Sequence, residues 1–283
     1  MGLPEASQEG GRREAIRVAI SKLPSRVRTR AQNAWRGFEL AIMHLEADRE
    51  IASFRAITAQ EEAATALFMA LKEKGYPGSD RLNVREHRHK AALWPFLEAV
   101  KRRLIKDLPG LSLNYVIDPS EPSISVKIPI RSLMNDPELP DYAISMLHPL
   151  DLLHSVKGQP YLFQDELKEV SEHLSATSIE RLVSKLSNAR NGLLYASDQS
   201  LPKSRAQMKD ILGRRDQAEN ALVLTIAVMQ TDSHQAMVLQ SLEAFLGIVG
   251  KSEGLAMPYP VPPDSLVDIN LTRTPRVTEA PDG

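Results

Sequence analysis

The sequence predicts an all-α protein: a multi-helix up-and-down bundle with one inserted β-hairpin and an extended C-terminal tail. Three observations support this fold class. Apolar residues recur at spacings of three and four through most of the chain, which is the period of an amphipathic helix. The period changes to two only around 111–129, where β-branched and polar residues alternate as in a hairpin. Prolines without helical periodicity then fill 251–283, which predicts an extended or disordered tail.

Three helices are expected in the first part of the chain, and the third is central in the bundle. Residues 9–23 form a basic amphipathic helix that Pro24 stops, and Ser25 is expected to cap a second helix. The third helix, 49–74, is apolar on nearly all sides, which is typical of a helix surrounded by others. The chain therefore divides into a basic helix, a helical domain and a tail, over 1–24, 25–250 and 251–283.

The hairpin is expected to be inserted between helices, within 107–130. A helix that Asn83 caps should precede it, with a kink or a break at Pro95. An irregular connector with at most short helical turns should follow over 137–159, where His154 is expected to be structural. The helices of this part are expected at 84–106, 164–174, 177–190, 204–230 and 233–249.

Charge is balanced over the whole chain but uneven along it. The net charge is -1, so the molecule as a whole is not an obvious polyanion binder. A basic patch near the N-terminus nevertheless suits nucleic-acid contact, and it suits a solvated helix with salt bridges equally well. This patch consists of Arg12, Arg13, Arg17, Lys22, Arg26, Arg28, Arg30 and Arg36, against Glu14 alone.

Composition restricts the compartment and the chemistry. The absence of Cys excludes disulfides and thiolate-bound metal sites, and it fits a reducing cytoplasm. The first residues lack a signal-peptide core, and no apolar run approaches the ~18 residues that a membrane span needs. We therefore expect a cytoplasmic protein that makes no membrane contact.

A polar stripe crosses the apolar central helix. Arg55, Thr58, Glu62 and Thr65 point in nearly one direction, and Glu61 lies beside them. A buried charge has to be paired, because burying it alone costs several kcal/mol. The stripe therefore either pairs internally or lines a polar site, for which Arg55, Glu61 and Glu62 are the candidate binding residues.

A dense polar turn, residues 85–90, opens the next helix. Glu86 and His89 have the Glu-x-x-His spacing of carboxylate-bridged di-iron bundles. Such a site also needs a second Glu-x-x-His and further carboxylates, and the sequence contains no second copy, so no metal and no cofactor are expected. The favoured interpretation is a basic turn that contacts phosphate, with His87, His89 and Lys90 as binding candidates.

A third candidate element, Arg190-Asn191-Gly192-Leu193-Leu194-Tyr195, lies at the end of a predicted helix. Positions five apart on an unbroken helix point about 140° away from each other, so Arg190 and Tyr195 can share a site only if the helix ends or bends between them. Asn191-Gly192 is a pair that ends helices, because Gly accepts a left-handed backbone. The alternative is that Arg190 only offsets the negative end of the helix dipole.

Three local motifs, in this order, resemble the HEPN superfamily, and within it the abortive-infection type represented by AbiV. Residues 59–66, AQEEAATA, are similar to the Glu-Glu-containing helix of that group, with Thr65 where Lys is usual. Residues 87–90 are similar to its His-Lys-x-Lys turn, and 190–195 to its Arg-containing stretch that ends in Leu-Tyr. The resemblance spans about 29–230, and the hairpin and the connector lie outside it.

The resemblance implies a phage-defence protein that acts on RNA or translation as a homodimer. Many HEPN proteins are metal-independent ribonucleases whose site is Arg-x4–6-His, usually with a polar residue after the Arg. Arg190 and Asn191 match the first half, whereas Tyr195 stands in place of the His. A Tyr with a pKa of about 10 is a poor base beside an imidazole of about 6.5. The implied catalytic residues are Arg190, Asn191 and Tyr195, and His87 or His89 is the candidate source of the missing imidazole.

Three functions are consistent with these observations. The first is an RNA-cleaving or translation-blocking effector of phage defence, in which Glu62 and Arg55 shape the pocket around Arg190. The second is a non-catalytic HEPN-like module that binds RNA or a protein partner, which the missing His favours. The third is a helical scaffold, which would be supported by an Arg55 enclosed in an internal ion pair.

Overall fold

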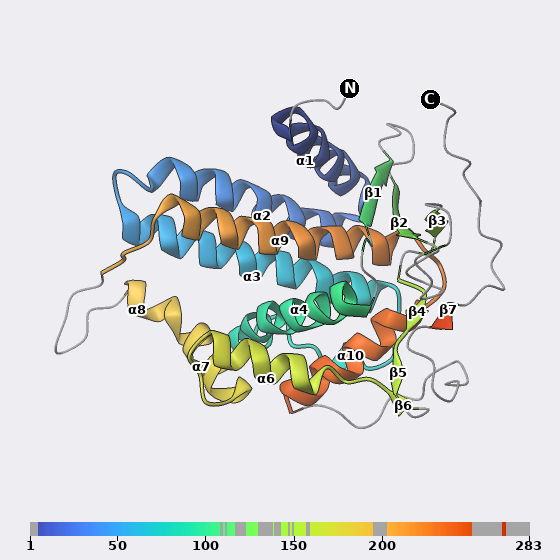
Figure 1. The fold of residues 1–283 in the computed structure, drawn as a ribbon. Helices are drawn as coiled ribbons and strands as arrows, with labels where there is room; N and C mark the ends of the chain where they lie inside the picture. The colour runs from blue at the N-terminus through green and yellow to red at the C-terminus, as the bar shows by residue number, and fades with distance from the viewer. Residues whose placement is uncertain are drawn as a thin grey trace.

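The structure is a computed structural model, and it describes residues 5–107, 110, 112–116, 123–129, 138, 143–146, 148, 150–156, 159–194, 203–250 and 268–269. Within these ranges the chain is mostly helical, as predicted (Figure 1). The helices are α1 (Glu5–Lys22), α2 (Ser25–His44), α3 (Arg49–Glu73), α4 (His87–Asp107), α6 (Gln164–His173), α7 (Ile179–Ala189), α8 (Asn191–Leu194), α9 (Met208–Met229) and α10 (Ala236–Ile248), with the short 3-10 helix η1 (Ser79–Arg81) before α4. None of these described helices is long and apolar enough to cross a membrane.

Helix α3 is central, as its apolar surface predicts. Helices α2 and α9 pack along it, and α4 and α8 contact it from another side. Figure 1 shows α1 beyond α2 and α9, whereas α4, α6, α7 and α10 lie on the opposite side of α3. The bundle therefore has two outer faces, with the basic helix α1 on one and the first turn of α4 and the end of α7 on the other.

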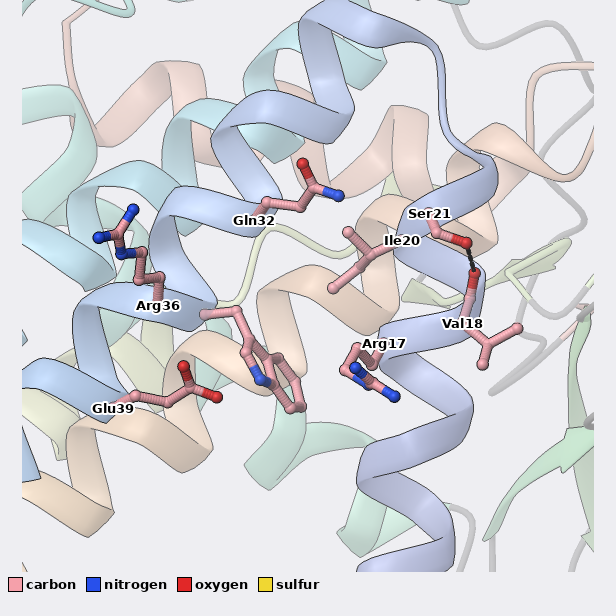
Figure 2. A pocket seen from close by; sticks show the side chains of 8 residues that line it. Arg17, Val18, Ile20, Ser21, Gln32, Arg36 and Glu39 are labelled. Atoms are coloured by element: carbon pink, nitrogen blue, oxygen red, sulfur yellow. Dashed lines mark hydrogen bonds between the residues drawn. The ribbon is translucent and has the colours of Figure 1, made fainter.

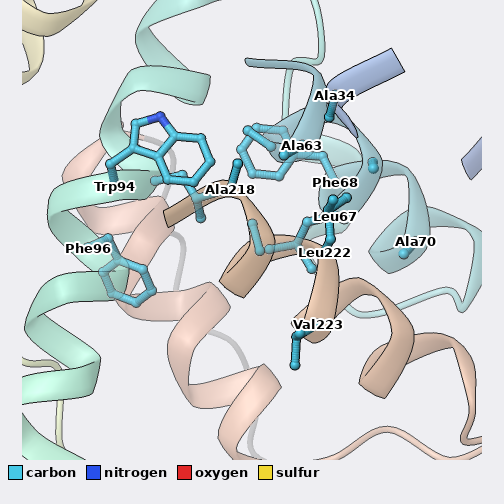
Figure 3. Packing of buried hydrophobic residues seen from close by; sticks show 14 of the residues in the cluster. Ala34, Ala63, Leu67, Phe68, Ala70, Trp94, Phe96, Ala218, Leu222 and Val223 are labelled. Carbon is cyan, nitrogen blue, oxygen red and sulfur yellow. The ribbon is translucent and has the colours of Figure 1, made fainter. Parts of the chain in front are cut away.

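Small side chains let the central helices approach closely, and aromatic rings fill the space between α3, α4 and α10. Ala63 of α3 has no exposed surface. Phe245 of α10 contacts Phe68 of α3 at a ring-centroid distance of 5.7 Å, and Phe96 of α4 at 5.5 Å. Figure 3 shows part of this core, including Leu67 and Phe68 of α3 and Leu222 of α9. Burial of each such ring stabilises the fold by about 1.5–3 kcal/mol.

Gly37 of α2 marks a close approach between α2 and α3. A Cβ at this position would lie only 2.8 Å from the Cβ of Ala59 in α3. Because Ala59 is fixed in the core, we expect Gly37→Ala to lower the free energy of unfolding by about 1–3 kcal/mol. Gly213→Ala in α9 is the matched control, because nothing lies within 4 Å of the added Cβ, and it should stabilise by about 0.5–1 kcal/mol. Urea denaturation measures both changes, and equal stability of the two variants would contradict the close approach.

The predicted hairpin is present and belongs to a three-stranded antiparallel sheet. Strand β1 (Ser112–Val116) pairs with β2 (Ser123–Pro129), and Tyr115 lies opposite Ile124. Gln230, which follows α9, fixes the hairpin to the bundle. Its side-chain oxygen accepts from the backbone N–H of Ile124 at 2.9 Å, and its side-chain nitrogen donates to the carbonyl of the same residue at 2.6 Å.

The prediction of an irregular connector over 137–159 is wrong, because strands occur there. They are β3 (Ala143–Met146), which pairs with β2, β5 (Ser155–Val156), which pairs with β6 (Gln159–Pro160), and β4 (Leu152–Leu153), which pairs with β7 (Asp268–Ile269). Strand β7 belongs to the segment that was expected to be an extended tail. Strands of two to four residues are too short to show a period of two in the sequence, so periodicity does not detect them.

Most helices lie where the apolar period predicts them, but some ends differ. Helix α4 begins at His87 rather than at 84, because the side chain of Asn83 accepts the N–H of Arg85 in a turn before the helix, at 3.0 Å. Pro95 neither ends nor divides α4. Helix α9 begins at Met208 rather than at 204. These shifts matter at α4, whose first turn carries part of the candidate site.

Candidate functional site

A buried carboxylate on the central helix contacts polar side chains from two other parts of the chain. The side chain of Glu61, on α3, is 8% exposed. Its Oε1 lies 2.8 Å from Nδ1 of His87. Its Oε2 lies 3.4 Å from Nζ of Lys90 and 3.3 Å from Nη1 of Arg190. We name these four residues the Glu61 cluster.

Two helix ends position the partners of Glu61. Helix α4 begins at His87, so His87 and Lys90 stand three positions apart in its first turn and face the same side. Helix α7 ends at Ala189, and Arg190 follows with φ −63° and ψ −43° before α8 begins. The helix is interrupted at Arg190, and the Arg190 side chain reaches Glu61, which lies 129 positions earlier in the sequence.

The sequence predicts that the helix ends or bends between Arg190 and Tyr195, but the observed interruption lies at a different residue. The helix ends before Arg190, and Gly192 lies inside α8 without the left-handed backbone of a helix cap. Arg190 therefore does more than offset a helix dipole, since its guanidinium contacts Glu61. Asn191 is exposed at the start of α8, with no side-chain bond to the cluster among the described residues, and Tyr195 lies outside the described residues.

Arg190 links several groups. Its Nη1 lies 3.4 Å from Nε2 of His87, and its Cζ lies 5.6 Å from the ring centroid of Phe54 on α3. Its Nε is buried and has no hydrogen-bond partner among the described residues. A buried donor without a partner costs about 1–3 kcal/mol, so an acceptor atom that reached this nitrogen would recover that energy.

The charges of the Glu61 cluster do not cancel. Counted as formal charges, Lys90 and Arg190 contribute one positive charge each and Glu61 one negative charge, which leaves one positive charge before His87 is counted. The side chains of His87 and Arg190 are 43% and 28% exposed, so solutes can reach them. A surplus of cationic groups next to an imidazole suits the binding of a phosphate and the transfer of a proton.

The two other expected binding residues on α3 lie outside the cluster. Glu62 accepts from Arg30 of α2 at 3.1 Å, and Arg55 is exposed, with no ion pair to any described residue. Neighbouring positions on a helix point about 100° apart, so the carboxylates of Glu61 and Glu62 face different helices. Glu62 therefore faces α2 and Arg55 faces solvent, whereas Glu61 beside them lines the cluster.

His89 lies in the first turn of α4, but it fixes the turn before the helix and is not part of the cluster. It is 1% exposed, and its Nδ1 accepts from the backbone N–H of Asn83 at 3.1 Å. Its Nε2 lies 3.2 Å from Glu86, so the Glu-x-x-His pair is a direct side-chain contact. Among the described residues, no group of three or more His, Cys, Asp or Glu could hold a metal ion.

A second buried network joins the end of α4 to α6, and no motif in the sequence indicates it. Asp107 accepts from Arg103 Nε at 2.7 Å and lies 3.0 Å from His154 Nδ1. Arg103 also lies 3.4 Å from Glu166, which accepts from the hydroxyl of Tyr161 at 2.8 Å. Burial, followed by the hydrogen bond to Glu166, raises the pKa of Tyr161. These contacts agree with the structural role expected of His154.

Asp107 should make the stability of the protein depend on pH. Burial alone would raise the pKa of Asp107, but hydrogen bonds from His154 and Arg103 outweigh burial and hold this pKa below its ordinary value. Such a group stabilises the fold above its unfolded pKa, and the stabilisation is lost as pH falls through the folded pKa. We expect Asp107→Asn to lower the free energy of unfolding near neutral pH, and the loss to shrink below about pH 4. Denaturation of both proteins at several pH values measures this loss of unfolding free energy. A loss that is equal at every pH would show that Asp107 does not make the stability depend on pH.

The hollows described in this structure lie away from the Glu61 cluster. One of about 480 Å³ lies between α1 and α2, and an apolar cavity of about 110 Å³ lies among α3, α4, α9 and α10. Neither is lined by a residue of the cluster. A ligand of the cluster would contact the exposed parts of His87 and Arg190.

Similarity to known proteins does not identify the site. Comparisons with protein-family models, with curated proteins and with solved structures found no match to this chain.

Proposed function

We propose that the chain is an HEPN-like protein of the AbiV type, which acts in phage defence by metal-independent cleavage of RNA at the Glu61 cluster. One observation carries this proposal: side chains of all three motifs meet at one carboxylate. Glu61 comes from the Glu-Glu helix, His87 and Lys90 come from the polar turn, and Arg190 comes from the Arg-Asn stretch. Residues that only stabilised separate helix ends would not be expected to contact the same carboxylate.

In this proposal His87 supplies the imidazole that is missing at position 195. Glu61 accepts the Nδ1–H of His87, which orients the ring and leaves Nε2 as the basic nitrogen in the tautomer that this bond favours. Nε2 accepts from Nη1 of Arg190 at 3.4 Å, longer than the range of about 2.7–3.2 Å of a strong N–H bond. A ribose hydroxyl would have to replace this weak contact to donate to Nε2. An imidazole oriented by a carboxylate is a suitable general base near neutral pH.

Cleavage follows the 2′-hydroxyl route. His87 takes the proton of a ribose 2′-hydroxyl, and the 2′-oxygen forms a bond to the adjacent phosphorus. The bond from phosphorus to O5′ breaks, and the His87 imidazolium returns a proton to O5′. The products are a 2′,3′-cyclic phosphate and a 5′-hydroxyl end. Arg190 and Lys90 stabilise the negative charge that develops on the phosphoryl oxygens.

The alternative is a non-catalytic HEPN-like module that binds RNA or a protein partner. Each cation of the Glu61 cluster already pairs with Glu61, and this closed network favours the alternative. The third possibility, a scaffold without a site, loses its expected support because Arg55 is exposed rather than enclosed in an ion pair. For both remaining functions the resemblance implies a homodimer, and the composition favours a cytoplasmic location. The partner is RNA in the first function, and RNA or a protein in the alternative.

Incubation of the purified protein with end-labelled RNA in the presence of EDTA separates the two functions. Cleavage predicts shorter products that end in a 2′,3′-cyclic phosphate. The alternative predicts intact RNA, together with either RNA binding that weakens steeply as salt concentration rises or a stable complex with a protein. RNA that is neither cleaved nor bound, by a protein that forms no such complex, would contradict both.

A further inference from the structure

The hollow between α1 and α2 is a second candidate site, on the other face of the bundle from the Glu61 cluster. It has a volume of about 480 Å³, within the range of about 300–1,000 Å³ that small-molecule sites occupy. Figure 1 shows α1 beyond α2 and α9, whereas α4 and α7, which contribute to the Glu61 cluster, lie across α3. The polar residues that line the hollow are Arg17, Ser21, Gln32, Trp35, Arg36 and Glu39 (Figure 2).

The indole of Trp35 provides an aromatic surface in this hollow, and neighbouring side chains hold it in place. It is half-buried, and the guanidinium of Arg13 lies 4.9 Å from its ring centroid. Arg13 is held there by a hydrogen bond to Glu219 of α9 at 2.9 Å. The indole is therefore held against a fixed cation while it also lines the hollow. A ring held in this way loses little freedom when another planar group stacks on it.

Polar side chains with free hydrogen-bonding groups surround this indole. Gln32, Arg36 and Glu39 are exposed on α2, and none of them makes a hydrogen bond or ion pair with another residue in the described part of the chain. Arg17 of α1 bonds Glu14 at 2.7 Å, but both side chains are exposed, so this pair is weak. The hollow thus offers an amide, a carboxylate and two guanidinium groups beside one aromatic ring.

We propose that this hollow binds a nucleotide, either free or as one unit of single-stranded RNA. A base stacks on Trp35, since base–aromatic stacking is worth about 1–3 kcal/mol. Its polar edge hydrogen-bonds to Gln32 and Glu39, which can donate to and accept from a base. The phosphate contacts the guanidinium of Arg36, or that of Arg17 after it leaves Glu14. An apolar ligand would leave these polar groups without hydrogen-bond partners. A peptide that lacks a planar ring next to an anionic group would leave either the indole or the guanidinium groups without a contact.

Binding here does not depend on cleavage at the Glu61 cluster, because the two sets of residues are separate. The chain has two tryptophans, Trp35 in the hollow and Trp94, which is 9% exposed on α4. In a Trp94→Phe variant of the full chain, Trp35 is the single tryptophan reporter. A nucleotide that stacks on Trp35 should quench its fluorescence in a saturable way.

The test titrates this reporter with AMP, GMP, CMP and UMP, and separately with a short single-stranded oligoribonucleotide. We expect saturable quenching and an affinity about tenfold weaker after Arg36→Glu, since one charge-assisted contact to phosphate is lost. Arg26→Glu makes the same charge change on an exposed position of α2 outside the hollow, so it should change the affinity by less than about twofold. Binding of mononucleotides identifies a free nucleotide as sufficient, and binding of the oligoribonucleotide alone identifies a strand as the ligand.

Three outcomes would overturn the proposal. They are no saturable quenching with any of these probes, equal weakening by Arg36→Glu and Arg26→Glu, and unchanged affinity after Arg36→Glu. Because Arg36 is exposed and has no described partner, its substitution should leave the fold intact, which a circular dichroism melting curve checks.

Discussion

Replacing Arg190 with alanine is expected to lower the rate of RNA cleavage by about 10²–10³-fold. Loss of one donor that stabilises charge in a transition state has an effect of this size. The guanidinium of Arg190 stands beside Nε2 of His87, where the phosphate must lie during proton transfer. Single-turnover cleavage of labelled RNA by the purified variant measures the change. In cells, expression of the parent should be toxic or should restrict phage, and the variant should abolish this effect.

Two further variants separate the role of Arg190 from general damage. Arg181→Ala removes an exposed arginine from α7, the helix that Arg190 follows, so it should leave cleavage unchanged. Arg190→Lys keeps the charge but loses the planar fork that binds phosphate through two parallel bonds, so its rate should lie between those of the parent and Arg190→Ala. An Arg190→Ala variant as active and as toxic as the parent would refute the assignment of this residue.

Glu61→Ala is expected to lower the free energy of unfolding by about 3–5 kcal/mol. The carboxylate is 8% exposed and is the shared partner of Lys90 and Arg190. Lys90 is 10% exposed, so removal of Glu61 leaves a positive charge in a nearly buried place without its partner. Denaturant unfolding, followed by circular dichroism, measures the loss.

The adjacent carboxylate provides the control for this change. Glu62 pairs with Arg30, whose side chain is 44% exposed, and such a pair contributes about 0–1 kcal/mol. Glu62→Ala should therefore destabilise the protein much less than Glu61→Ala, although the two residues are neighbours on one helix. Equal losses for the two variants would show that Glu61 is not the buried centre of the ion-pair network.

The helices were largely predictable because each buries one face over several turns. The apolar surface of α3 predicts its central place, and the alternation around β1 and β2 predicts the hairpin. The short strands β3 to β7 were not predictable, because their pairing is set by backbone contacts between distant segments. The same holds for the Asp107 network, in which His154 and Glu166 come from segments that the sequence does not link.

The residues of the candidate site could be predicted from the sequence, whereas the contacts between them could be predicted only in part. The local motifs contain Glu61, His87, Lys90 and Arg190, and all four meet. Spacing alone assigned Arg55 and Glu62 to the same site, because a stripe of polar residues shows which side chains share a face but not which helix that face meets. The break at Arg190 likewise depends on where α8 packs against α3, which the pair Asn191-Gly192 does not reveal.

The cleavage rates of His87→Ala, Arg190→Ala and the double variant test most directly whether the cluster works as one site. Residues that act together in one transition state are strongly non-additive, so the double variant should be no slower than the slower single variant by more than about twofold. Two multiplied losses would mean that His87 and Arg190 act separately. Full activity of all three proteins would mean that RNA is cleaved elsewhere.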